Sequence, residues 1–247
     1  MTLQACADIV AKGDPDRFQA AMAAPVKARE TLLPIYAFNV EVARAPWIAS
    51  EPMIGEMRLQ WWRDALGEIA AGGTVRAHEV TTPLAAVLDA EGADLLDRLI
   101  AARRWDLYTE AFEDETHFSD YLDATGGHLM WVTARTLGAD DENVFRKLGR
   151  ANALANLFLA VPELERRGRK PLLDGRPEAV RHLADAALET IEGNHAPKLG
   201  RAASLAAWRT RALLKRAAAE PGRVVTGHLA ESEFRKRLSL IWASFKT

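Results

Sequence analysis

The sequence predicts an all-α protein that folds as a single helical bundle. Helix start and stop residues recur along the 247 residues, and no segment shows the sustained alternation of apolar and polar residues that marks strands. The length suits one large domain or two small ones, and no repeat, low-complexity tract or long linker divides the chain. We therefore expect one domain over residues 1–247, built from about ten helices.

Prolines and capping side chains mark where most of these helices begin. Proline is favoured in the first turn, where its missing N–H would have no partner, and a preceding Ser or Asp can cap the free N–H groups. Asp14-Pro15 and Ser50 with Pro52 have this arrangement. Further helices are expected to open close to Pro25, Pro83, Pro177, Pro197 and Pro221.

Glycines mark where several helices end, because glycine readily adopts the left-handed conformation that follows a helix C-terminus. Gly72, Gly138 and Gly168 each follow a helical pattern, and residues 169–176 are rich enough in proline and glycine to form a loop. These signals together predict helices over residues 14–24, 25–45, 50–71, 82–92, 93–112, 117–137, 140–167, 177–191, 197–219 and 221–245.

Composition restricts the compartment and the cofactors. Cys6 is the only cysteine, so no internal disulfide can form and a reducing compartment fits. The N-terminal residues show no export or organelle signal, and nowhere do about 18 apolar residues follow one another. The six histidines lack metal-ligand spacing, and no nucleotide-binding or hydrolase motif is present. We expect a cytoplasmic protein, peripheral at the inner membrane if it meets a membrane.

Charge is unevenly distributed along the chain. The net charge is −2, but the residues from Lys198 onward hold 11 Lys or Arg and 3 Asp or Glu, which leaves −10 for the first 197 residues. The C-terminal part from about residue 197 is therefore basic, with Trp208, Trp242 and Phe245 among its cations. A solvated helix face would explain this pattern, and contact with anionic lipid or an acidic protein partner is the alternative. Nucleic acid is not an expected partner, since the whole domain is acidic and lacks a reading motif.

Three separated segments share a pattern of motif residues. They hold Arg29-Glu30 before Tyr36-Ala37-Phe38, then Tyr121 before Gly126-Gly127, and last Asn156 before Arg167-Gly168-Arg169. In this order they resemble the squalene/phytoene synthase family, and the resemblance spans about residues 16 to 172. It implies an all-α fold of the isoprenoid synthase type, with helices around a central cavity or a packed core.

The resemblance fails at the family's metal-binding positions. Family members carry aspartate clusters on two helices, which hold the magnesium ions that grip a substrate diphosphate. Aligned on the motifs above, those positions hold Ala43, Arg44, Trp47, Ala160 and Leu164. Mg²⁺ requires oxygen ligands, and it stabilises the leaving diphosphate by several kcal/mol. The resemblance thus implies the family's fold without catalytic residues, without a metal site and without a cofactor.

A further motif points within the family. Residues 56–66, EMRLQWWRDAL, are similar to the MRLQWWRDAL sequence of a divergent branch that includes the mitochondrial assembly factor for respiratory complex I. Without the family, Leu59, Trp62 and Leu66 form an apolar stripe at helical spacing, so Trp62 is predicted in the core and Trp61 beside a cavity or interface. The residues that we predict to line a pocket are Tyr36, Asn39, Arg58, Trp61, Gly127 and Asn156.

The paired glycines Gly126 and Gly127 require a separate explanation. Each glycine inside a helix costs about 1 kcal/mol relative to alanine, so something should approach the backbone closely at this point. A neighbouring helix is one interpretation, and a prenyl chain is the other.

Three functions remain open from the sequence. The first is a non-catalytic binding or assembly protein, with a role in respiratory complex biogenesis implied by the resemblance. The second is a prenyl-diphosphate transferase that uses Mg²⁺ through substituted ligands, for which the candidates are Glu41, Asp64, Asp106 and Glu163. The third is a prenyl-lipid carrier with an apolar tunnel between the helices that bear Tyr36, Trp61, Gly127 and Asn156.

Overall fold

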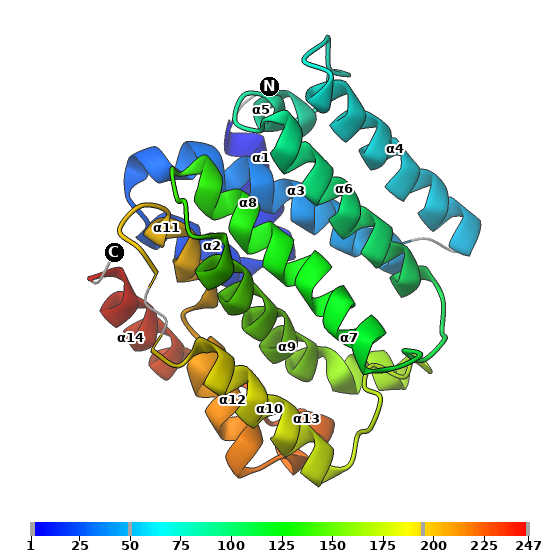
Figure 1. Ribbon diagram of the computed structural model, residues 1–247, viewed down its shortest axis with the longest axis vertical. Coiled ribbons are helices and arrows are strands. Elements are labelled where there is room, and N and C mark those ends of the chain that lie inside the picture. Colours follow the sequence, from blue (N-terminus) through cyan, green and yellow to red (C-terminus); the bar gives the residue numbers. More distant parts are fainter. Residues whose placement is uncertain (1–2, 49–50, 194–195, 246–247) are drawn as a thin grey trace.

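The computed structural model describes residues 3–48, 51–193 and 196–245, and these residues form helices and loops without a β-strand. The prediction of an all-α protein is confirmed (Figure 1). None of the helices in these ranges has an apolar stretch of the length that crossing a bilayer requires.

The N-terminal half holds the helices that surround the first hydrophobic cluster. Their bounds are α1 Leu3–Gly13, α2 Pro15–Ala23, η1 Val26–Ala28, α3 Arg29–Ile48, α4 Pro52–Ala70, α5 Thr81–Ala85, α6 Ala90–Arg103 and η2 Arg104–Leu107. Phe38, Leu59 and Leu96 are fully buried in this cluster. Trp62 is also buried there, which confirms its predicted place in the core.

The C-terminal half surrounds a second cluster, in which Phe158, Val180 and Leu213 are buried. Its elements are α7 Glu115–Leu122, the π-helical turn η3 Asp123–Gly127, α8 His128–Thr136, α9 Glu142–Arg166, α10 Pro177–Ile191, α11 Arg201–Ser204, η4 Leu205–Ala207, α12 Thr210–Ala219, α13 Gly222–Val225 and α14 Glu233–Ser244. The basic C-terminal part thus comprises α11 to α14.

Several predicted boundaries are confirmed, and the cap residues explain them. Helices α2, α4 and α10 each begin with proline at the predicted position. The Asp14 carboxylate accepts a hydrogen bond from the backbone N–H of Arg17 at 2.9 Å, as the predicted N-cap should. The predicted cap Ser50 lies outside the described residues.

Other predicted helices are wrong in extent. Helix α1 was not predicted. The helix predicted over 197–219 begins only at Arg201, after Gly200 with a φ of 77°, and is divided by the 3-10 turn η4. The helix predicted over 221–245 is divided after α13, where Gly227 adopts a φ of 74°. The short helix predicted to end at Gly92 stops at Ala85, and Gly92 instead lies in the first turn of α6, where it donates to Asp89.

The predicted helices over 93–112 and 117–137 are also interrupted. The first gives way to the turn η2 and then to an extended residue, Tyr108. This break lets Trp105 stack on Phe112 with their ring centroids 3.9 Å apart. The second contains the π-helical turn η3 between α7 and α8.

The paired glycines meet another helix. A Cβ on Gly126 would lie 2.4 Å from the carbonyl oxygen of Gly149 in α9, and a Cβ on Gly149 would lie 2.3 Å from the carbonyl oxygen of Gly126. The two backbones therefore touch at glycine on both sides. Of the two interpretations of the paired glycines, the neighbouring helix is confirmed.

Candidate functional site

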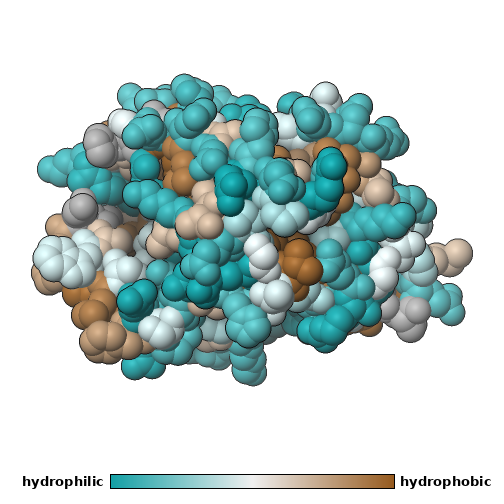
Figure 2. Space-filling model, turned by 90° about the horizontal axis from the view of Figure 1, so that it is seen from below, coloured by the Kyte–Doolittle hydropathy of each residue, from teal (hydrophilic) through white to brown (hydrophobic). Residues whose placement is uncertain are grey.

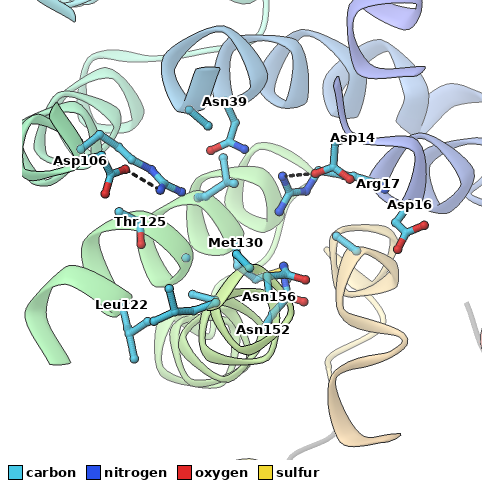
Figure 3. A pocket seen from close by; sticks show the side chains of 18 of the residues that line it. Asp14, Asp16, Arg17, Asn39, Asp106, Leu122, Thr125, Met130, Asn152 and Asn156 are labelled. Carbon is cyan, nitrogen blue, oxygen red and sulfur yellow. Dashed lines mark hydrogen bonds and ion pairs between the residues drawn. The ribbon is translucent and has the colours of Figure 1, made fainter. Parts of the chain in front are cut away.

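A cavity of about 540 Å³ lies between α3, η3, α8 and α9. Figure 3 shows the side chain of Asn39 directed into it from α3, opposite Asn152 and Asn156 on α9. Tyr36 also lines the cavity, and the Arg17 guanidinium lies 5.3 Å from its ring centroid. Burial raises the pKa of Tyr36 above its ordinary value, so its hydroxyl stays protonated.

Three of the predicted pocket residues, Tyr36, Asn39 and Asn156, therefore line one cavity, and the other three do not. Arg58 and Trp61 belong to α4, which contributes no described residue to the cavity wall. The prediction for Gly127 is wrong by one position, because its neighbour Gly126 is the glycine that lines the cavity.

Trp61 is held by a cluster outside the cavity. Its ring lies edge-on to Trp62 at 4.9 Å between centroids, and the Arg76 guanidinium is 5.1 Å from its ring centroid. Arg58 is exposed on the same helix. The helical stripe that buries Trp62 turns both residues away from the cavity, and this geometry could not be read from the resemblance.

The positions of the family's aspartates do lie at the cavity. Ala43 and Trp47 on α3 and Ala160 and Leu164 on α9 all line it, and none of them offers an oxygen ligand. The fifth position, Arg44, is turned to Glu41, with 2.8 Å between its Nη1 atom and the carboxylate. The cavity therefore has apolar side chains at four of the five positions where the resemblance places metal ligands.

A cation covers one of these substituted positions. The Arg167 guanidinium carbon lies 4.4 Å from the ring centroid of Trp47, which is a cation–π contact. The same guanidinium donates to Glu163 at 2.7 Å, and Arg166 also pairs with this carboxylate. Glu163, a candidate substitute ligand, is thus already neutralised by two arginines, and these lower its pKa.

Asp14 and Asp106 reach the cavity, but each carboxylate has a cationic partner. Asp14 pairs with Arg17 at 2.8 Å. Asp106 accepts from Arg103 at 2.9 Å and from the Tyr121 hydroxyl at 2.8 Å. Figure 3 shows these two pairs on opposite sides of the cavity. They are not arranged to share a cation.

Asp16 anchors a third charged group at the cavity edge. Its carboxylate pairs with Arg209, which precedes α12, and with Lys236 of α14. Arg209 and Lys236 are nearly buried, so the pairs are weakly screened by solvent. This group links the N-terminal helices to the basic C-terminal part.

The residues present do not fit Mg²⁺. Within the described ranges, no group of three or more His, Cys, Asp or Glu side chains is placed to hold a metal. The other proposed substitute ligands lie apart, with Glu41 on Arg44 and Asp64 accepting from Gln60 at 2.8 Å. Among the described residues that line the cavity, cations outnumber the three aspartates: Arg17, Arg103, Arg169, Arg209 and Lys236.

The cavity also holds buried polar atoms without a hydrogen-bond partner among the described residues. They are Oδ1 of Asn39, Nε1 of Trp208 and Nε of Arg103 and Arg209. Unpartnered buried polar groups are costly, and the four residues that carry these atoms all line the cavity.

Comparison with known proteins gives the family. The squalene/phytoene synthase profile matches residues 10–235. The chain belongs to the squalene/phytoene synthase family. Two solved structures of similar fold cover 99% of this chain. The first is a dehydrosqualene synthase in complex with ligand, with a TM-score of 0.73, 15% identity and 95% of its own chain covered. The second, squalene synthase HpnC from Alicyclobacillus acidocaldarius, has a TM-score of 0.57, 18% identity and 92% covered.

These likenesses confirm the isoprenoid synthase fold, and at such low identity they show the fold alone. Among curated proteins, several similar ones are named NADH dehydrogenase (ubiquinone) complex I, assembly factor 6. The mouse protein is 23% identical over 172 residues, which cover 64% of this chain and 48% of the mouse protein. The Drosophila melanogaster homolog is 28% identical over 167 residues, covering 64% and 50%. The chain spans about half the length of these relatives.

Proposed function

We propose that this chain is a non-catalytic member of its family that acts as a binding and assembly factor in respiratory complex biogenesis. The observation that carries the proposal is the cavity wall, where alanine, tryptophan and leucine occupy the metal-ligand positions. The role in respiratory complex biogenesis is proposed from the names of similar proteins, which are complex I assembly factors. A cytoplasmic protein that acts at the inner membrane is the location that we propose with it.

The exposed side of α4 is the surface that we propose for the protein partner. Met53 and Met57 are 72% and 68% exposed, Ile54 lies between them, and Arg58 and Gln60 are also exposed. Met57, Arg58 and Gln60 belong to the EMRLQWWRDAL motif. The apolar stripe of this motif is buried in the first hydrophobic cluster, and these three residues lie outside the stripe. Flexible methionine side chains suit a contact surface. The partner would be a subunit of complex I or another protein of its assembly.

The test is cross-linking of the tagged full-length chain in native membranes, followed by detergent extraction, affinity capture and mass spectrometry. We expect complex I subunits or assembly proteins to be recovered with the wild type and lost with Met53→Ser combined with Met57→Ser. Met22→Ser, an exposed methionine on α2, is the matched control and should behave as wild type. Recovery of no such protein by the wild type, or equal recovery by all variants, would contradict the proposal.

The size of the cavity favours a second function, a carrier of prenyl lipid. A cavity of about 540 Å³ with Leu129, Met130 and Leu157 in its wall offers apolar contact to a chain, and the side chain of Asn39 is directed into it (Figure 3). Native mass spectrometry of the purified protein with added farnesol should then show a one-to-one complex. Ala160→Phe, which fills the cavity from α9, should remove it. A complex that survives this substitution would place the lipid elsewhere.

A further inference from the structure

Helix α14 presents an apolar face to solvent. Phe234, Leu238, Ile241, Trp242 and Phe245 are between 42% and 84% exposed. Each residue of an α-helix advances by about 100°, so these five side chains fall within a sector of about 100° along the whole helix. A surface helix of a soluble domain ordinarily turns such a stripe toward the core.

The opposite side of α14 is the side that holds it to the protein. Leu240 is buried, and Ala243 packs against the first hydrophobic cluster. Lys236 pairs with Asp16 of α2 and, at 3.4 Å, with Glu233. The attachment leaves the apolar stripe facing outward, so the exposed face is a consequence of how the helix is docked.

Cations border the stripe on both sides. On the helical wheel, Arg235 lies next to Trp242 at one edge of the stripe, and Arg237 lies next to Ile241 at the other edge. Both arginines are exposed, and no ion pair joins either one to another described residue. In Figure 2, brown apolar side chains gather at the left end of the molecule, where Figure 1 places α14.

We infer that α14 binds the surface of an anionic membrane, with its apolar face in the headgroup region and Arg235 and Arg237 on lipid phosphates. An amphipathic helix in this orientation buries aromatic and aliphatic side chains at the acyl boundary, and its cations add attraction to anionic lipid. The free positive charge at both edges favours a lipid surface over a second copy of the same helix, which would bring like charges together. This inference does not depend on the proposed assembly function.

The test is co-flotation of the full-length protein with lipid vesicles. Vesicles of phosphatidylcholine with phosphatidylglycerol should carry the protein, and vesicles of phosphatidylcholine alone should carry much less. Replacing Arg235 and Arg237 by Gln should weaken partitioning about fivefold for each cation removed. Trp242→Ser combined with Phe245→Ser should lower it by more than about tenfold, because both side chains lose apolar burial. High salt should weaken binding of the wild type.

Matched controls separate membrane binding from other outcomes. Val26→Ser with Leu199→Ser removes apolar side chains that are 73% and 60% exposed outside α14 and should leave flotation unchanged. All substituted positions are exposed, so thermal unfolding should match the wild type. Failure of the wild type to float with anionic vesicles would overturn the inference, as would equal flotation of all variants. A wild-type dimer that the serine pair at 242 and 245 converts to monomer, without flotation, would assign the face to a second copy instead.

Discussion

Substitution of Gly149 by alanine tests the backbone contact between α9 and the π-helical turn η3, whose Gly126 lines the cavity. Gly149 lies in α9 against η3, and an added Cβ would be 2.3 Å from the carbonyl oxygen of Gly126 and 2.7 Å from Cβ of Met130. Ordinary van der Waals contact begins at about 3.4 Å. The two helices would have to separate by about 1 Å, and the nearest atom is backbone, which cannot rotate away.

The expected loss follows from two opposing effects. Alanine favours the helical backbone by about 1 kcal/mol relative to glycine. Overpacking of a filled interior costs about 1 to 3 kcal/mol, and backbone contact places this site at the upper end. The net loss of unfolding free energy is about 2 kcal/mol, and for a chain of this size the midpoint should fall by about 4 to 8 °C.

The assay is thermal and urea unfolding followed by far-ultraviolet circular dichroism. Gly67→Ala is the matched control, since Gly67 lies in α4 with nothing within 4 Å of an added Cβ. It should gain about 1 kcal/mol. If Gly149→Ala is as stable as Gly67→Ala, α9 and η3 do not touch at glycine, and the helix contact that explains the paired glycines is refuted.

Two further predictions concern charged groups. Asp16→Asn should cost about 2 kcal/mol in urea unfolding, because it leaves the nearly buried Arg209 and Lys236 without their shared partner. Asp174→Asn, in an exposed pair, should leave the unfolding free energy nearly unchanged, and equal losses would show that the Asp16 group is not structural. Burial is the largest cause of the lowered pKa of His128, which lies below 6.5 in the folded state. The unfolded chain therefore binds the proton more readily than the folded chain. The free energy of unfolding should fall as the pH drops below about 6.5. His128→Gln should make this acid loss shallower in unfolding measured against pH, and an unchanged slope would contradict it.

The sequence was informative wherever a local signal decides the structure. Pro177 opened α10, and its end at Ile191 was also predicted. The apolar stripe of α4 correctly placed Trp62 in the core. These outcomes depend on backbone propensity and periodicity, which a short window contains.

The errors arose where tertiary contacts decide. Gly200 and Gly227 could have continued a loop or a helix, and only the fold selects their positive φ angles. Trp61 was expected beside a cavity or an interface because it lies between the apolar and polar stripes of its helix, yet Arg76 covers its ring. The Asp16 pair with Arg209 joins residues 193 positions apart and carries no motif.

The cavity itself was partly predicted. The resemblance gave the helices of Tyr36 and Asn156, and four of the five positions that it aligns on the family's aspartates line the wall. It could not give the number of cations there, because Arg103, Arg209 and Lys236 come from three separate segments outside the matched motifs. Their convergence is a property of the folded chain.

The most direct test of the central claim is incubation of the purified protein with Mg²⁺ and farnesyl diphosphate, with chromatography of the products. A catalytic member of the squalene/phytoene synthase family, assayed in parallel, supplies the positive control. The account predicts no condensed hydrocarbon and no heat of Mg²⁺-dependent diphosphate binding by calorimetry, since the metal-ligand positions are apolar. A condensed prenyl product that requires Mg²⁺ and disappears in Asp106→Asn would contradict it and establish a transferase.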